Sequence, residues 1–458
     1  MSGVCIENSL TEIEQIMKSI SIYIHIPFCV KKCQYCDFLS APADSRAQEV
    51  YLRALKQEIR EQAARYREYE VQTVFIGGGT PTAVPCEKLC EVLKTVLTCY
   101  RVNPQAEISM EANPGTVTKE ALLAYRKAGI NRLSIGLQST DDGELKLLGR
   151  IHTYRDFLQT YRWAQEAGFT NINLDIMSAL PGQSVENYKK TLETVLSLKP
   201  QHISAYSLIV EEGTPFYEKY GQESEKLQAT GENQPDLPSE EEEREMYALT
   251  EKLLAAAGYH RYEISNYALP GRECRHNRVY WKRGNYVGFG LGAASMVENV
   301  RFENTRKMQE YLAEYVGVPD AEPVFADAAQ GDEQELSNEQ EFSLREDTHP
   351  ENEQVLSTWA DVNSRETQQI FQGENVHPLS PQEQMEETMF LGLRLTEGVS
   401  KAEFHRQFGV SMEQIYGEVI QENIAQGLLA DEAGYLRLTR EGMDLSNYVM
   451  AQFLLDEV

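Results

Sequence analysis

Three cysteines lie close together near the start of the chain, in the pattern Cys29-x3-Cys33-x2-Cys36. They follow residues 22–26, where apolar and polar side chains alternate as they do in a strand, and a proline ends that strand. A short irregular loop after a strand can direct three thiolates at one metal centre. The sequence therefore predicts that these three cysteines bind a metal.

Two kinds of metal centre fit this spacing. Cysteines two to four residues apart also suit zinc, for which His25 would be the fourth ligand. A 4Fe-4S cluster held by only three cysteines has one iron open to an exogenous ligand, whereas a structural zinc site closes its shell. The absence of a fourth cysteine from the run favours the cluster.

Glycines and polar residues end other predicted strands. The run Gly77–Pro81, GGGTP, ends the second strand, where backbone without side chains lets a ligand approach and presents amide groups to a carboxylate. Glu111, Gln138 and Asp175 lie at or near the carboxyl ends of the next three strands. Because the carboxyl ends of parallel strands meet on one side, these residues predict a site at the mouth of a barrel.

The elements that must position these residues follow a βα rhythm. From residue 21 to about residue 215, short apolar runs alternate with helix-like segments, which is typical of repeated βα units around a parallel sheet. Six in a row predict an α/β fold, either a partial barrel or an open doubly wound sheet. The expected strands are 21–28, 73–81, 107–114, 132–139, 171–182 and 202–210.

The 458 residues divide by composition into four parts. Residues 1–20 form an N-terminal lead, and residues 21–300 form the barrel with its extension. Residues 318–387 hold 18 Asp or Glu against two Arg, a formal charge of −16, which predicts a disordered acidic insertion. Residues 388–458 return to a globular pattern of helices followed by a two-stranded turn, which predicts a smaller helical, winged-helix-like domain.

Composition limits the class of protein. No stretch approaches the roughly 20 apolar residues that span a bilayer, so we expect a cytoplasmic protein with peripheral membrane contact at most. The eight cysteines show no disulfide framework and read as reduced thiols. The net charge of −28 argues against nucleic acid as a partner, so DNA binding by the winged-helix-like tail is the weakest functional hypothesis.

The motifs together resemble the coproporphyrinogen-oxidase-like group of the radical SAM family. The shared strings are YIHIPFCxxxCxYCDF, GGGTPT, EANP, SIGLQS, LGR and NLDIMSALPGQ, which span nearly the whole first half of the chain. The resemblance implies a partial (β/α)6 radical SAM barrel followed by a smaller HemN-like C-terminal domain. It also implies that Cys29, Cys33 and Cys36 hold a 4Fe-4S cluster whose open iron is chelated by S-adenosylmethionine. In that family, one-electron reduction then breaks a C–S bond and gives a 5′-deoxyadenosyl radical.

The same resemblance implies a set of S-adenosylmethionine contacts, while no catalytic residue is assigned. The implied contacts are Tyr23, Tyr35, Gly78, Gly79, Thr80, Glu111, Gln138, Arg150, Asp175 and Ala205.

Two functions within the group stay open at this point. One is an oxygen-independent coproporphyrinogen III oxidase, which decarboxylates two propionates to vinyls. The other is a HemW-type haem chaperone, which binds haem and transfers it to an acceptor protein. The decarboxylase typically carries a further cysteine two positions beyond the third ligand, where this chain has Phe38. The decarboxylase also has a longer N-terminal segment before its cysteine run than the short lead before Cys29 in this chain. Both differences favour the chaperone, with haem and an unidentified acceptor protein as its partners.

A second motif supports the chaperone. The run from His276 to Trp281, HNRVYW, matches the HNxxYW motif characteristic of that branch, which implies His276 as an axial haem ligand. Imidazole is a normal haem ligand, and Tyr280 and Trp281 could face the flat macrocycle. Cys274 is a weaker candidate ligand. The alternative for His276 is a packed core residue.

Overall fold

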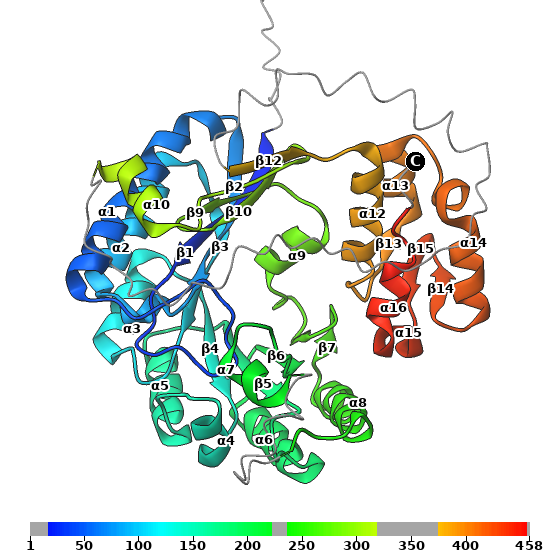
Figure 1. Cartoon of the computed structure of the whole chain (residues 1–458), viewed down its shortest axis with the longest axis horizontal. Helices are drawn as coiled ribbons and strands as arrows, with labels where there is room; N and C mark the ends of the chain where they lie inside the picture. Colours follow the sequence, from blue (N-terminus) through cyan, green and yellow to red (C-terminus); the bar gives the residue numbers. More distant parts are fainter. Residues whose placement is uncertain (1–16, 222–235, 318–373, 456–458) are drawn as a thin grey trace, which may run out of the picture.

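The computed structural model describes residues 17–221, 236–317 and 374–455, which form a large α/β body and a smaller domain (Figure 1). Most of the predicted lead and of the predicted acidic insertion therefore lies outside the described residues.

Six parallel strands lie side by side in chain order, which confirms the predicted number and direction of strands. Because the order never reverses, right-handed crossovers place all the connecting helices on one face, as in a barrel and unlike in a doubly wound sheet. The strands are β1 (Lys18–Ile26), β2 (Tyr69–Gly78), β3 (Val102–Ala112), β4 (Arg132–Gln138), β5 (Ile172–Ser178) and β6 (His202–Ser207).

Short strands continue the sheet at both edges, so that the described residues form a twelve-stranded open sheet. On the β1 side β9 pairs in parallel and the next three strands pair antiparallel, while on the β6 side two antiparallel strands follow. The added strands are β9 (Tyr286–Phe289), β10 (Ala294–Val297), β11 (Val300–Glu303), β12 (Glu374–Pro378), β8 (Asn266–Ala268) and β7 (His260–Arg261).

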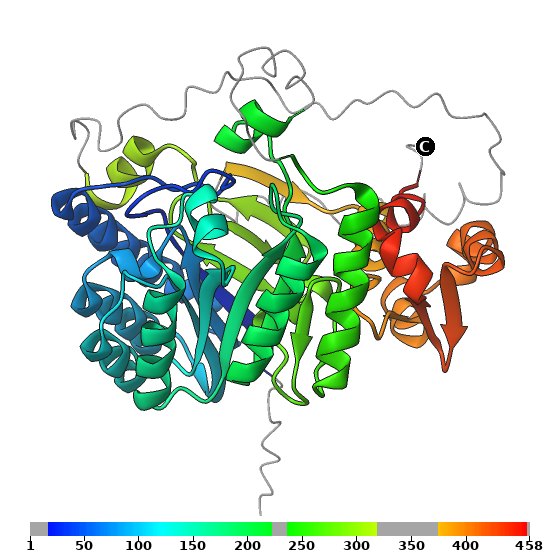
Figure 2. The same cartoon turned by 90° about the horizontal axis from the view of Figure 1, so that it is seen from below.

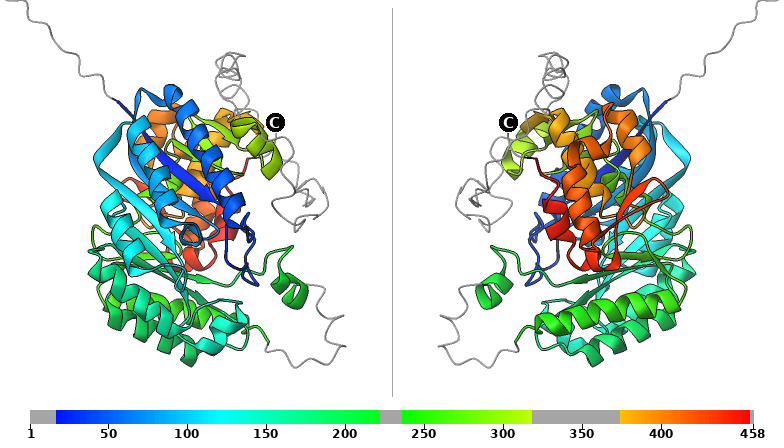
Figure 3. Two further views of the ribbon diagram at one scale, coloured as in Figure 1. Left: turned by 90° about the vertical axis from the view of Figure 1, so that its left-hand side faces the viewer. Right: turned by 90° about the vertical axis from the view of Figure 1, so that its right-hand side faces the viewer.

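Helices form an outer layer around the curved sheet (Figures 2 and 3). Side-chain caps define several of them: Asp44 accepts from the Ala47 amide, and Thr153 and Asp156 form a capping box. No described helix is long and apolar enough to cross a membrane. The helices are α1 (Ser45–Gln62), α2 (Cys86–Cys99), α3 (Lys119–Ala128), α4 (Asp142–Leu147), α5 (Tyr154–Glu166), α6 (Val185–Leu198), α7 (Pro215–Tyr220), α8 (Glu240–Ala256), α9 (Arg275–Trp281) and α10 (Met308–Val316), with short 3-10 turns at Ala63–Tyr66 and Pro81–Ala83.

The two faces of each central strand differ in polarity. In β4, Leu133, Ile135 and Leu137 are fully buried in the core beneath the helices, where each stabilises the fold by about 1.5–3 kcal/mol. The alternate residues Arg132 and Ser134 face the inside of the sheet and border a cavity. The hydrophobic core therefore lies outside the strands, and the inner face is left to polar side chains.

The smaller C-terminal domain has its own hydrophobic core. Its helices are followed by an antiparallel strand pair, as the sequence predicted, and a third short strand completes that sheet. The elements are α12 (Pro381–Gly392), β13 (Val399–Ser400), α13 (Lys401–Phe408), α14 (Met412–Ala425), β14 (Leu429–Glu432), β15 (Tyr435–Leu438), α15 (Arg440–Asp444) and α16 (Ser446–Ala451).

Two predicted boundaries are wrong. The lead does not extend to residue 20, because β1 begins at Lys18. The insertion does not extend to residue 387, because β12 and most of α12 lie before that point. The polar composition of this segment concealed a helix start, where Ser380 and Glu383 form a capping box, and a buried core residue, Met385.

One acidic residue of the supposed insertion joins the two parts of the protein. Glu387 on α12 accepts hydrogen bonds from Arg283 (2.9 Å) and from Arg301 (2.8 Å), which both belong to the extension of the barrel. Arg283 and Glu387 have largely buried side chains, so this carboxylate has a specific structural role.

Candidate functional site

A cavity of about 440 Å³ lies on the inner face of the sheet. Its wall combines the cysteine loop, the inward side chains of β1 to β6 and one face of α9. Of the residues predicted for the site, those that border it are Tyr23, Cys29, Cys33, Tyr35, Cys36, Gly78, Gly79, Thr80, Glu111, Gln138, Arg150, Asp175 and His276.

Ala205 is the exception among the predicted S-adenosylmethionine contacts. It is buried in β6 and does not border the cavity, because its neighbours Ser204 and Tyr206 occupy the inward positions of that strand. Its amide also donates to the Ser265 carbonyl (2.9 Å), so it presents no free donor.

The cysteine loop is held by backbone hydrogen bonds along its length. The Cys29 amide donates to the Ala41 carbonyl (3.2 Å), which folds the loop back on itself. Farther on, the Gln34 amide donates to Leu148 (3.1 Å), and the Gln34 carbonyl accepts from Phe216 (2.9 Å). The loop is therefore fixed to two other βα connections, and its three sulfurs face one cavity.

The zinc alternative conflicts with the surroundings of His25. Its Nε2 donates to the Leu39 carbonyl (2.9 Å) and its Nδ1 accepts from the Tyr23 hydroxyl (3.0 Å), so neither nitrogen is free to bind a metal. Within the described residues, no three His, Cys, Asp or Glu side chains are placed to hold a single metal ion. A 4Fe-4S cluster has a different requirement, because each cysteine binds a different iron.

Burial, together with the neighbouring thiols Cys33 and Cys29, raises the pKa of the Cys36 thiol to about 11. Metal binding requires thiolates, so a bound cluster would displace protons from this group of cysteines.

The glycines of GGGTP allow two loops to approach each other. A Cβ on Gly79 would lie 2.9 Å from the Cys29 sulfur, and Gly78 has a φ of +115°, which side chains disfavour. The predicted free amides are not present. Gly78 donates to Glu111 (3.2 Å), Gly79 to Ile26 (2.9 Å), and the next amide also bonds to a loop carbonyl. The glycines therefore seat the cysteine loop rather than present donors to a carboxylate.

Arg150 connects the cysteine loop to the sheet. Its Nη2 donates to Asn113 (2.6 Å) and to the Gly136 carbonyl (2.8 Å), and its Nη1 donates to the Cys33 sulfur (3.6 Å). Asn113 in turn donates to the Thr80 hydroxyl (2.8 Å). This chain of hydrogen bonds fixes the orientation of Cys33 relative to the strand ends.

Two carboxylates form an acidic zone of the cavity wall. Burial, together with the charge of Asp175, raises the pKa of Glu111 to about 8, and burial also raises the pKa of Asp175. Asp175 accepts from Asn173 (2.7 Å) and from Ser134 (3.3 Å), whereas among the described residues Glu111 accepts only from the Gly78 amide. A buried carboxylate with a single donor suits a cationic ligand.

Gln138 combines a cavity position with an unusual backbone. Its φ of +69° is left-handed although it is not a glycine, and it ends β4. Its side-chain oxygen accepts from the Tyr206 hydroxyl (2.9 Å). Tyr206 also borders the cavity and closes the wall on the β6 side.

His276 borders the cavity but is fully buried, with both ring nitrogens bonded inside the protein. The Thr73 hydroxyl donates to Ser21 and therefore accepts from Nδ1 (2.7 Å), which leaves Nε2 to accept from the Tyr280 hydroxyl (2.7 Å). Burial, together with the charge of Arg132, lowers the pKa of His276 to about 3, so the imidazole is neutral. The lone pair that would bind iron is thus engaged by Tyr280.

The other residues of this motif point in different directions. Trp281 lies beneath the Arg394 guanidinium, 4.4 Å from the ring centroid, and so contacts the C-terminal domain instead of the cavity. Cys274 is fully buried and does not border the cavity, and burial raises its pKa to about 12. Trp281 therefore does not lie where it would face a macrocycle in the cavity, and Cys274 does not lie where it would bind haem iron there. Helix α9 lies between the sheet and the C-terminal domain (Figure 1).

Several cavity residues were not singled out from the sequence, among them Asn113, Arg132 and Tyr206. The alternation within RLSIGLQ could have indicated Arg132, because it shares the inward face with Gln138. Nothing in the local sequence marks the contacts of the other two.

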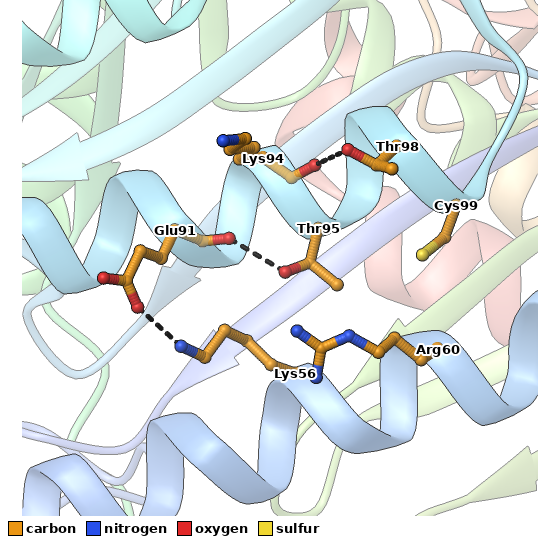
Figure 4. A pocket seen from close by; sticks show the side chains of 7 residues that line it. All are labelled: Lys56, Arg60, Glu91, Lys94, Thr95, Thr98 and Cys99. Atoms are coloured by element: carbon orange, nitrogen blue, oxygen red, sulfur yellow. Dashed lines mark hydrogen bonds and ion pairs between the residues drawn. The ribbon is translucent and has the colours of Figure 1, made fainter.

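A second cavity, of about 330 Å³, lies between α1 and α2 on the outside of the barrel (Figure 4). Lys56 pairs there with Glu91 (2.6 Å), and the Thr95 and Thr98 hydroxyls bond to helix carbonyls. None of the predicted site residues borders this cavity.

Family models match both parts of the chain. The radical SAM superfamily model matches residues 23–195, and the HemN C-terminal domain model matches residues 379–445. The second match begins close to α12, in agreement with the corrected boundary of the insertion.

Curated relatives match over nearly the whole chain. The chain is 34% identical to the haem chaperone HemW of Bacillus subtilis over 95% of this chain and 99% of that protein. It is 32% identical to the haem chaperone HemW of Lactococcus lactis over 97% and 99%, respectively. Among solved structures, the coproporphyrinogen III oxidase HemN of Escherichia coli superposes with a TM-score of 0.71 at 21% identity, over 96% of this chain and 91% of that one. This last likeness shows a shared fold.

Proposed function

Because the chain belongs to the HemW family of haem chaperones, within the radical SAM superfamily, we propose that it binds haem and passes it to an acceptor protein. The observation that carries this proposal is the similarity to haem chaperones along almost the full length of both chains. Phe38 adds to it, since an exposed aromatic ring borders the cavity at the position where the decarboxylase has a further cysteine.

The residues present fit a 4Fe-4S cluster with S-adenosylmethionine. Three cysteines on one anchored loop, Cys29, Cys33 and Cys36, would hold the cluster and leave one iron open. The acidic zone formed by Glu111 and Asp175 suits the cationic groups of S-adenosylmethionine. When bound, the cluster would supply single electrons to the ligand on its open iron. The chain's own residues position both groups and shield them from solvent.

The reduced thiols support a reducing compartment, which is the cytoplasm in our proposal. All seven described cysteines are free, although Cys86 and Cys90 lie one helical turn apart on α2.

The proposal is tested on one anaerobically reconstituted sample. We expect the wild-type protein to bind haem, seen as a change in the haem absorbance, and to release it to an apoprotein haem sink such as apomyoglobin. We expect no conversion of coproporphyrinogen III to protoporphyrinogen IX in the same sample. Turnover of coproporphyrinogen without stable haem binding would favour the decarboxylase instead.

Binding of S-adenosylmethionine is expected to depend on the protonation of Glu111. Since its pKa is raised to about 8, the carboxyl is protonated below that pH and must lose its proton to pair with a cation. Affinity should therefore fall by up to about tenfold for each pH unit below 8. Equilibrium binding between pH 6 and pH 9 measures this effect.

The matched variant Glu111→Gln should bind S-adenosylmethionine more weakly and with a flatter pH profile. If this variant keeps the wild-type profile, the pH dependence belongs to another group, such as Asp175 or the ligand itself.

A further inference from the structure

The cavity wall contains a buried arginine that has no hydrogen-bond or ion-pair partner among the described residues. Arg132 is 2% exposed, and its guanidinium makes no hydrogen bond or ion pair within the described part of the chain. Arginine offers five N–H donors and stays charged, so burying it without acceptors is costly. Such a side chain on a cavity wall indicates a site for an anion.

Nearby acids do not fill this role. The groups whose charges act on Arg132 include Glu107 and Asp175. Glu107 accepts from the amides of Arg275 and His276 at the start of α9, each at 3.2 Å. Asp175 is held by Asn173 and Ser134. Both carboxylates are thus directed at other donors, and neither lies within ion-pair distance of the guanidinium.

The cavity wall holds a second unused polar group. Asn277, on the cavity face of α9, makes no side-chain hydrogen bond within the described residues. The arginine fork matches a carboxylate, which accepts two parallel N–H bonds, and a carboxamide on the wall of the same cavity is a further donor for the ligand.

This position differs from that expected for the carboxylate of S-adenosylmethionine. Arg132 begins β4, whereas Gln138 ends it, six residues later, or about 20 Å along an extended strand. The cysteine loop lies at the carboxyl ends of the strands, and the acidic zone of Glu111 and Asp175 lines the same cavity. In the sheet Glu111 pairs with Ser134 and Asp175 with Gly136, so both acids lie closer to the carboxyl ends of the strands than Arg132 does. Arg132 is therefore a basic group at the amino end of the same inward row, next to the acidic zone.

We propose that Arg132 binds a carboxylate of a second ligand, which shares the cavity with S-adenosylmethionine. The identity of this carboxylate rests on the proposed function: it is a propionate of haem. Arg132 would then anchor the ligand by one side chain.

The test compares haem with its dimethyl ester, whose propionates are masked, on the reconstituted full chain. We expect the wild type to bind haem at least tenfold more tightly than the ester. Arg132→Gln should weaken haem binding at least tenfold and leave the affinities for the ester and for S-adenosylmethionine unchanged. Arg394→Gln, which removes a partly buried arginine outside the cavity, is the control and should change none of the three.

Equal binding of haem and ester by the wild type would overturn the proposal. So would a loss of S-adenosylmethionine binding in Arg132→Gln, because the carboxylate would then belong to that ligand. If Arg132→Gln does not fold, Arg132→Lys keeps the charge without the fork and should show an intermediate preference for haem over ester.

A second probe separates this site from the proposed function. If the wild type binds no haem, thermal stabilisation by the propionate ion, but not by propionamide, still tests the site. Its presence in the wild type and absence in Arg132→Gln would support the site without the chaperone function. Stabilisation that survives in Arg132→Gln, or that is absent from the wild type, would overturn it.

Discussion

Replacing Cys33 with serine is expected to abolish the absorbance of the reconstituted 4Fe-4S cluster and to reduce bound iron to background. Of the cysteines that the structure describes, three face the cavity, so the loss of one leaves two of these thiolates for four irons. Cys33 is the central one of the three, and Arg150 donates to its sulfur (3.6 Å), which holds this thiol in place. Binding of S-adenosylmethionine should be lost together with the cluster.

The control for this experiment is Cys99→Ser. Cys99 ends α2 and lines the outer cavity shown in Figure 4, away from the cysteine loop. Its replacement should leave iron content and absorbance unchanged. Retention of the cluster by Cys33→Ser, or purification of the wild type with one zinc in place of iron, would contradict the assignment of Cys29, Cys33 and Cys36.

Replacing His276 with alanine is expected to destabilise the protein by about 3 kcal/mol, because it empties a buried site and leaves the Thr73 and Tyr280 hydroxyls without their partner. Chemical denaturation followed by circular dichroism measures this loss. It arises whether or not His276 binds haem, so stability alone does not assign the residue.

Haem affinity separates the two roles when a second variant is measured. In the structure Nε2 of His276 accepts from the Tyr280 hydroxyl, so iron can bind only after that hydrogen bond breaks. Tyr280→Phe removes the competing hydroxyl and keeps the ring. If His276 is the axial ligand, Tyr280→Phe should tighten haem binding about fivefold, the value of one hydrogen bond of about 1 kcal/mol, while His276→Ala abolishes the ligation.

The opposite signs of these two effects make the test specific. Unchanged haem affinity in both variants would show that His276 is a structural core residue and that iron is bound elsewhere. Iron content of the cluster should be unchanged in both, since neither residue touches the cysteine loop.

The sequence by itself determined the features that depend on local spacing. The three cysteines after the first strand, the six strands and the inward positions of Glu111 and Asp175 all follow from short-range periodicity, because alternation along a strand decides which face a side chain occupies. The same rule places Ala205 on the other face, although the resemblance had implied a contact there.

The tertiary structure decided everything that depends on contacts between distant segments. Nδ1 of His276 is hydrogen-bonded to Thr73, which lies 203 positions earlier in the chain, and no sequence motif indicates that pairing. The composition of the segment before residue 388 predicts a solvated stretch, but in the structure Glu387 forms an ion pair with Arg283 across the domain boundary. Arg132 shows the same limit. Its inward direction can be read from the strand, but its lack of a partner emerges only when Glu107 is seen bound to α9. Periodicity along a strand determines which face of the sheet a side chain occupies. Its protonation state and its hydrogen-bond partners are set by the neighbours that folding brings to it.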